Sequence, residues 1–317
     1  MKNIKEPAPP PMKKQRFTCF DSDQLNEVVK GASIELQQMD SGSFQADLFN
    51  VSLGNGTLDI GQYSRSVLSE GTFSPELMTF GFLLDAKGEG RMNGSLVKEY
   101  DMSLSDEGSP LEHYLTPDTL WSSFQFKRED LLKTGIDLNA HSTTVYYFNK
   151  KMQQNLSLKL GKIFTYLKDT DLSQTSSVST MMMYNHMLTT YAYAISHAHS
   201  CTPLKRSESA LLAKKIYYYL QDHANAPIQM IELTALIGKG ERTVERLFKK
   251  YFGVPPYTYL KLHRLHLIRK RLIQKDLSFI NITHLAMEHG FMEIGYFGRE
   301  YKKTFGETPS QTLKKSL

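Results

Sequence analysis

Apolar and polar residues alternate with a period of two through much of residues 17–148. Clear runs lie at 44–48 (FQADL) and 78–84 (MTFGFLL), and glycine and asparagine at 54–56 (GNG) are typical of a hairpin turn. Successive side chains of a strand point to opposite sides, so this alternation predicts strands with one buried face. We therefore predict an antiparallel sandwich or barrel over residues 17–148.

Helical spacing replaces the alternation after Asn149, and we expect residues 149–198 to form a helical segment for dimerisation or coupling. The second helix of this segment carries a stripe with the a/d spacing of a short coiled coil, formed by Val178, Met181, Asn185, Leu188 and Ile195. Asn185 would occupy an a position, where a polar residue can fix the register and partner number of a dimer. Packing of the stripe on the chain's own sheet is the alternative.

Two stretches of different composition mark the remaining boundaries. Residues 1–16 hold four prolines between positions 7 and 11, which predicts a flexible tail. Residues 199–208 contain Pro203 and are expected to form a linker. From residue 209 to 317 nearly every segment has helical spacing, so the chain should end in an all-helical domain.

Charge is divided unevenly along the 317 residues. Residues 205–317 carry 20 Lys and Arg against 10 Asp and Glu, whereas residues 1–204 carry 18 against 23. Cationic side chains gain affinity for a polyphosphate by releasing its counterions. The asymmetry therefore favours a nucleic-acid-binding domain joined to something else.

A helix, a glycine-containing turn and a second helix are predicted over Pro227–Phe252. The second helix should bury one apolar face that includes Val244 and Phe248, while Arg242 and Arg246 lie on the opposite face. A helix fits the major groove of DNA, and Arg in its first turns can form paired hydrogen bonds with guanine. We interpret this helix as one that reads DNA.

The same arrangement recurs over residues 282–304. Gly290 ends a packing helix, and the helix that follows places Arg299 and two lysines outward. A long helix between the motifs, about 257–273, should hold them at a fixed separation, with Arg269 among its solvent-facing cations. Two reading helices can enter successive major grooves if they lie about 34 Å apart along one DNA face.

Residues 209–317 resemble the DNA-binding domain of the AraC/XylS family. The first motif carries the family pattern as RTVERLFKK at 242–250 and GVPP at 253–256, and the second as YFGREYKK at 296–303 and FGETP at 305–309. The resemblance implies contact with double-stranded promoter DNA and with RNA polymerase. The residues that it places near bases or phosphates are Arg242, Thr243, Arg246, Lys249, Lys250, Gly295, Tyr296, Arg299, Lys302 and Lys303.

Two glycines in the second reading helix depart from the family pattern. Gly295 stands where a small polar residue is frequent, and Gly298 where Ser or Cys is common. They remove side chains from the helix and lower its helix propensity. We expect the first motif to discriminate between bases and the second to grip phosphates.

The resemblance also implies a cupin-like antiparallel β domain that binds a small effector, and hence an α+β protein of two domains. Candidate effector-binding residues are Arg65, Arg91 and Arg128, which could hold a carboxylate or phosphate, although plain surface arginines are the alternative. His113 and His141 lie far apart, and neither they nor the two cysteines have metal-ligand spacing. We expect no metal and no other cofactor.

The expected function is that of a sequence-specific transcription regulator, an activator by the family's usual mode, controlled by a small effector or by dimerisation. An enzyme with a β-barrel site joined to a DNA-targeting module is one alternative, but nucleophile–base pairs, phosphate loops and metal clusters are missing at recognisable spacing. An architectural DNA-binding protein is another. No apolar run approaches the roughly 20 residues of a membrane span, and the N-terminus lacks a signal-peptide core, so a cytoplasmic protein is expected.

Overall fold

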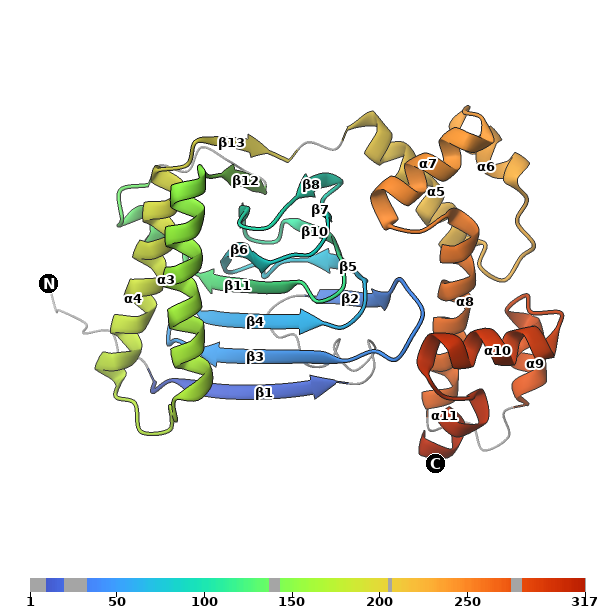
Figure 1. Cartoon of the computed structure of the whole chain (residues 1–317), viewed down its shortest axis with the longest axis horizontal. Helices are drawn as coiled ribbons and strands as arrows, with labels where there is room; N and C mark the ends of the chain where they lie inside the picture. The colour runs from blue at the N-terminus through green and yellow to red at the C-terminus, as the bar shows by residue number, and fades with distance from the viewer. Residues whose placement is uncertain (1–9, 20–32, 137–142, 205–206, 275–280, 317) are drawn as a thin grey trace, which may run out of the picture.

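The computed structural model describes residues 10–19, 33–136, 143–204, 207–274 and 281–316 (Figure 1). Two sheets and their covering helices form the N-terminal part, and helices alone form the C-terminal part. The two-domain α+β architecture expected from the sequence is therefore confirmed.

The β domain consists of two antiparallel sheets. The larger sheet contains β1 (Lys13–Cys19), β3 (Ala46–Ser52), β4 (Thr57–Tyr63), β6 (Met78–Asp85), β9 (Met102–Ser105), β11 (Leu120–Phe126), β12 (Thr144–Tyr147) and β13 (Ser200–Pro203). The smaller sheet contains β2 (Ser33–Gln38), β5 (Val67–Thr72), β7 (Gly90–Met92), β8 (Ser95–Val97) and β10 (Pro110–Leu115). Their strand orders are β1-β3-β4-β11-β6-β9-β12-β13 and β2-β5-β10-β7-β8.

Helices cover the larger sheet on one side and build the C-terminal domain on the other side of the molecule (Figure 1). The helices of the N-terminal part are α2 (Arg128–Leu132), α3 (Lys150–Asp169) and α4 (Ser177–Ser196). Those of the C-terminal domain are α5 (Glu208–Asp222), α6 (Met230–Ile237), α7 (Glu241–Phe252), α8 (Pro256–Ile273), α9 (Ile282–Glu288), α10 (Ile294–Phe305) and α11 (Pro309–Ser316).

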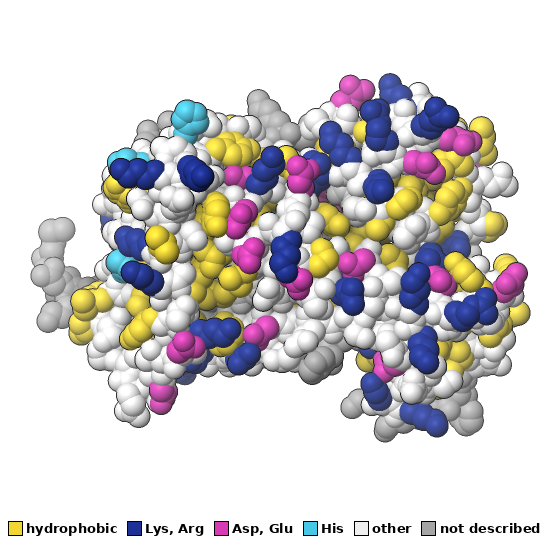
Figure 2. Space-filling view, in the orientation of Figure 1, with side chains coloured by type: hydrophobic (Ala, Val, Ile, Leu, Met, Phe, Trp, Pro, Cys, Tyr) yellow, Lys and Arg dark blue, Asp and Glu magenta, His cyan; other side chains and the backbone are white. Residues whose placement is uncertain are grey.

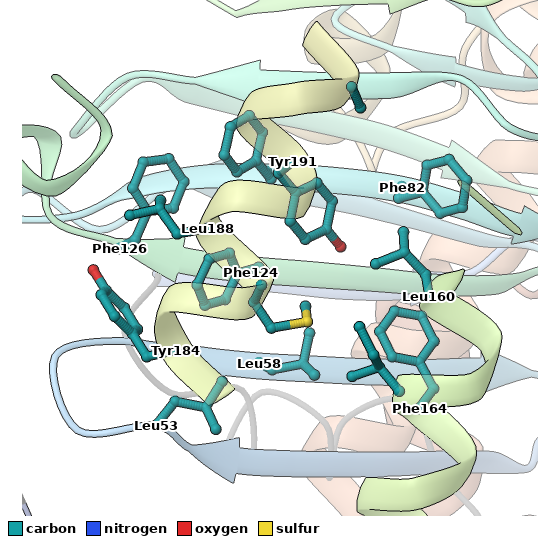
Figure 3. Close-up of a cluster of buried hydrophobic side chains, with 14 of the residues drawn as sticks. Leu53, Leu58, Phe82, Phe124, Phe126, Leu160, Phe164, Tyr184, Leu188 and Tyr191 are labelled. Atoms are coloured by element: carbon teal, nitrogen blue, oxygen red, sulfur yellow. The ribbon is translucent and has the colours of Figure 1, made fainter. Parts of the chain in front are cut away.

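An aromatic core joins α3 and α4 to the larger sheet (Figure 3). Tyr191 of α4 is fully buried, and its ring stacks on Phe80 at 4.8 Å and on Phe124 at 5.7 Å between ring centroids. Strand alternation turns both phenylalanines toward the helices and away from the other sheet. A second core, which includes Leu48, Leu83 and Leu115, fills the space between the two sheets.

The C-terminal domain has two further cores that meet along α8. Tyr259 and Leu260 belong to the core of the first helix-turn-helix motif, and Leu265 and Ile268 belong to the core of the second. The first of these cores also takes in Met39 and Leu68 from the β domain. The outer face of the smaller sheet is thus buried against the C-terminal domain.

Strands reach into two segments that the sequence predicted to be irregular. β1 begins at Lys13, inside the expected tail of residues 1–16, because its backbone pairs with the otherwise free edge of β3 from Lys13↔Ser52 to Cys19↔Ala46. β13 lies inside the expected linker of residues 199–208 and pairs with β12. Pro203 is compatible with this strand because the strand forms the edge of the sheet, where a missing N–H is tolerated.

The apolar stripe of α4 is split between two environments. Leu188 and Ile195 are buried against the sheet, so the prediction that they contact a partner chain is wrong. Val178 and Met181 are 60% and 48% exposed, and Asn185 is exposed beside them. The start of α4 therefore presents apolar side chains that this chain leaves uncovered.

Replacing Tyr191 tests how far the domain depends on the aromatic core. Tyr191→Ala should lower the free energy of unfolding by about 3–5 kcal/mol, because a buried ring leaves a cavity. Tyr191→Phe should lower the free energy of unfolding by less than about 1 kcal/mol. The hydroxyl that it removes lies 3.4 Å from Ser122 Oγ, so the hydrogen bond lost is a weak one. Urea unfolding of the two variants measures both values, and equal losses would contradict a role for ring packing.

Candidate nucleic-acid interface and its neighbouring cavity

The first helix-turn-helix motif is formed by α6 and α7 around a glycine-containing turn. Glu232 accepts the backbone N–H of Gln229 at 2.8 Å and so caps the start of α6. Gly238 ends α6 with φ of 64°, a left-handed conformation that favours glycine. Gly240 then caps α7 in an extended conformation, which sets the angle between the two helices.

Helix α7 separates its apolar and cationic residues as the sequence predicted. Its packing face, which includes Val244, Phe248 and Phe252, is buried. Arg242, Arg246, Lys249 and Lys250 are exposed on the remaining surface, and Thr243 is half-buried. The structure thus places all five predicted residues of this helix on one accessible element.

The second motif, α9 with α10, repeats this arrangement. Phe297, Tyr301 and Thr304 of α10 are buried. The predicted site residues on this helix are all exposed, namely Gly295, Tyr296, Arg299, Lys302 and Lys303. Figure 2 shows Lys and Arg side chains spread over the surface of the C-terminal domain.

Neither glycine on the outer surface of α10 is required by packing. A Cβ at residue 298 would meet no atom within 4 Å, and one at residue 295 would meet only Arg299 Nη1, at 3.6 Å. The second helix therefore has open space at both positions, and its reduced role in base discrimination stays a prediction.

Acidic partners neutralise some of the cations of the C-terminal domain. In the part of the chain that the structure describes, they do not neutralise the exposed Lys and Arg residues of α7 and α10, which form the two outward surfaces. Arg269 is 8% exposed and donates to Glu307 at 2.8 Å, which corrects the prediction that it faces solvent. Lys261 is paired with Glu300. Within the described residues, the arginines and lysines of the surfaces of α7 and α10 form no ion pair. Their charges remain available to an anionic partner.

Arg264 connects α8 to the segment between α5 and the first motif, a role that the sequence did not reveal. Its guanidinium donates to the carbonyl oxygens of Ala224 at 2.5 Å and Ala226 at 2.6 Å. It also lies against Gly290, where any side chain would collide with it. One half-buried arginine thus connects the segment after α5 with the turn of the second motif.

The β domain contacts the C-terminal ends of both outward helices, α7 and α10. Arg91 of β7 donates to the carbonyl oxygen of Lys250, and its guanidinium lies 5.3 Å from the centre of the Tyr251 ring. Gln38 Nε2 and the backbone N–H of Gly42 lie 3.3 Å and 3.2 Å from the carbonyl oxygen of Thr304. Both outward helices thus contact the same β domain.

A partly buried ion cluster reinforces this interface. Lys214 of α5 lies 2.5 Å from Glu112 of β10 and 3.2 Å from Glu70 of β5, and its side chain is 11% exposed. Glu70 also accepts hydrogen bonds from the hydroxyls of Tyr217 and Tyr218. The glutamates hold the pKa of Lys214 above its ordinary value against the opposing effect of burial.

The three candidate effector arginines do not meet at one site. Arg128 pairs with Asp106 at 2.9 Å and Glu107 at 2.5 Å, and Arg65 donates to the carbonyl oxygen of Ser43. Arg91 belongs to the domain interface. His141 lies outside the described residues, whereas burial lowers the pKa of His113 to about 4 and so keeps its ring neutral.

A cavity of about 100 Å³ lies between the two sheets, a feature that the sequence analysis did not find. The larger sheet contributes Asp59, Thr79 and Trp121 to its wall, and the smaller sheet contributes Ser69 and His113. The sequence does contain the polar residues that line this cavity, at inward positions of the strands. Only the pairing of the strands brings these residues together.

Residues 233–315 match a family described as "Helix-turn-helix domain". Curated relatives include the XylDLEGF operon transcriptional activator 3 of Pseudomonas putida, which is 30% identical over 34% of this chain and 33% of its own length. The probable thc operon regulatory protein of Rhodococcus erythropolis is 33% identical over 30% of this chain and 29% of its length. The chain thus spans about a third of the length of these relatives.

The solved structure of a probable AraC family transcriptional regulator from Rhodopseudomonas palustris aligns with 33% of this chain and with 97% of its own chain. The two are 29% identical, with a TM-score of 0.32. In the described part of the chain, no helix combines the length and apolar character needed to cross a bilayer.

Lys214→Met tests the interface between the domains. Loss of the ammonium leaves two carboxylates facing each other with little solvent, so the full chain should lose about 3 kcal/mol of stability. Unfolding should also separate into two transitions in differential scanning calorimetry.

The matched control is Lys215→Met on the same helix. Lys215 is exposed and its ammonium bonds to the carbonyl oxygen of Leu236, within the C-terminal domain. If both variants unfold alike, the ion cluster does not hold the domains together.

Proposed function

We propose that this chain, whose residues 233–315 form a helix-turn-helix DNA-binding domain of the AraC/XylS type, is a sequence-specific transcription activator. The observation that supports this most directly is the pair of exposed helices whose cations lack acidic partners within the described residues. On this proposal it acts in the cytoplasm, where promoter DNA and RNA polymerase are its partners.

The two outward surfaces have different roles in the proposal. Arg242 and Arg246 lie in the first turns of α7, where they can reach base edges once the helix enters the major groove. Lys249 and Lys250 lie in its last turn and suit phosphate contacts. On α10 the residues proposed to contact DNA are Gly295, Tyr296, Arg299, Lys302 and Lys303. Thr243 of α7 is also proposed to contact DNA.

Genome-wide enrichment of bound DNA fragments by the full-length protein at physiological salt tests this function. We expect one shared site with two half-elements about one helical turn apart. The neighbouring genes would identify the regulated pathway. Salt-sensitive binding without a shared site would instead favour an architectural protein and overturn the proposal.

Arg246→Ala should weaken binding to the enriched site by roughly 1–3 kcal/mol and relax the preference at one base pair. Titration of the site and of single-base variants of it measures both effects. Arg271→Ala is the matched control, because Arg271 is exposed and belongs to α8 rather than to α7 or α10. Unchanged sequence preference in Arg246→Ala would remove this residue from base recognition.

Effector control is proposed to act through the smaller sheet, which lies between the cavity and the C-terminal domain. On β10, His113 lines the cavity, whereas its neighbours Glu112 and Tyr114 face the C-terminal domain. On β5, Ser69 lines the cavity and Glu70 bonds to Lys214. A ligand that shifts these strands would alter the contacts that orient α7 and α10.

Dimerisation is proposed to use the exposed beginning of α4. Val178, Met181 and Asn185 lie there, and Met182 is 66% exposed beside them. Exposed apolar residues that cluster on one helix mark interaction surfaces. A second copy of the chain could cover them in a short helical pairing.

Asn185→Leu should change the assembly of the chain by replacing the polar a-position residue with an apolar one. Sedimentation equilibrium should show a tighter dimer or a larger oligomer. Asn155→Leu makes the same change at an exposed position of α3 and should leave the mass unchanged. The same mass for the Asn185 variant and the parent chain would exclude this surface from dimerisation.

A further inference from the structure

The cavity between the sheets has a mixed wall rather than an apolar one. Strand alternation directs Phe80 and Phe124 to the helices, so the larger sheet offers smaller and more polar side chains to the cavity. Thr79, Ser123 and Gln125 lie on this inner side, opposite Ile34 and Leu111 of the smaller sheet. Both sheets thus offer polar and apolar side chains to the cavity, because Leu83 also lines it from the larger sheet and His113 from the smaller one.

Among the described residues, three buried polar atoms in this wall have no hydrogen-bond partner. They are Oγ1 of Thr79, a residue only 1% exposed, Nε2 of His113 and Nε1 of Trp121. Buried polar groups are nearly always bonded, and leaving one unbonded reduces stability. All three residues line the cavity, so a molecule within it can supply the missing partners.

The charges of the wall restrict what that molecule can be. Asp59 and Asp101 line the cavity, and none of the described lining residues is Lys or Arg. Burial raises the pKa of Asp59 to about 6, although Asn50 donates to its carboxylate at 2.7 Å. A carboxylate or phosphate would enter next to these groups without a countercharge. The arginines predicted to bind such anions lie elsewhere.

The size of the cavity restricts the molecule further. An engineered apolar cavity of roughly 150 Å³ accepts benzene. At about 100 Å³, this cavity suits a molecule of no more than one ring. Apolar lining residues such as Leu83 and Leu111 can cover the ring while a single polar substituent faces Thr79 and His113.

We propose that the cavity binds a neutral, one-ring molecule with a hydroxyl or amino group, and that this group bonds to Thr79 and His113. The inference rests on the proposed role of the β domain as an effector sensor. It goes beyond that role by naming the chemical class of the effector and the residues that select it.

Trp121 allows binding to be measured without DNA. It is the single tryptophan of the chain and lines the cavity, so its emission reports directly on occupancy. Phenol titrated into the full-length protein should change this emission saturably. Toluene, which lacks the hydroxyl, and benzoate, which carries a charge, should each bind at least about tenfold more weakly.

Thr79→Val removes the hydroxyl while keeping the shape of the side chain. It should weaken phenol binding severalfold and leave toluene binding unchanged. Thr18→Val makes the same change at an exposed position of β1 and should alter neither affinity. His113→Phe, which removes the second polar group, should also abolish the preference for phenol over toluene.

Two results would overturn the proposal. One is Trp121 emission that phenol does not change, and the other is benzoate binding as tight as phenol binding. Because no DNA is present, neither result bears on sequence-specific DNA binding, which the fragment-enrichment experiment tests separately.

Discussion

The smaller sheet is buried on both faces, and the rest of the molecule is arranged around this constraint. One face closes the core and cavity between the sheets, and the other receives the C-terminal domain through Leu68 and the Lys214 ion cluster. Neighbouring residues of a strand point to opposite faces, so Ser69 lines the cavity while Glu70, the next residue, bonds to the C-terminal domain. The two faces are therefore mechanically coupled through the backbone.

The helical half of the fold could be predicted because its signals are local. The apolar face of α7 and Gly238 at the end of α6 are legible in a short window of sequence. The β domain was predicted only as a class. The pairing of β1 with β3, and of β13 with β12, joins residues distant in the chain, and no local pattern specifies such partners.

The same distinction explains which exposed residues of the candidate interface the sequence predicted. Arg246 and Arg299 are exposed because the helix period places them opposite residues that must pack. Arg269 has the same spacing, but it is buried because Glu307, far away in the sequence, neutralises it. The wall of the cavity is drawn from both sheets, so only their tertiary arrangement defines it.

The open glycines of α10 have a consequence for how the sequence of this chain can change. A side chain added at residue 298 meets no neighbour within 4 Å, and replacing a helical glycine with alanine contributes roughly 1 kcal/mol of stability. New contacts on this helix would therefore strengthen the fold instead of straining it. The outer surface of the second motif is therefore a place where the sequence can vary at no structural cost, so divergence between related chains can begin there.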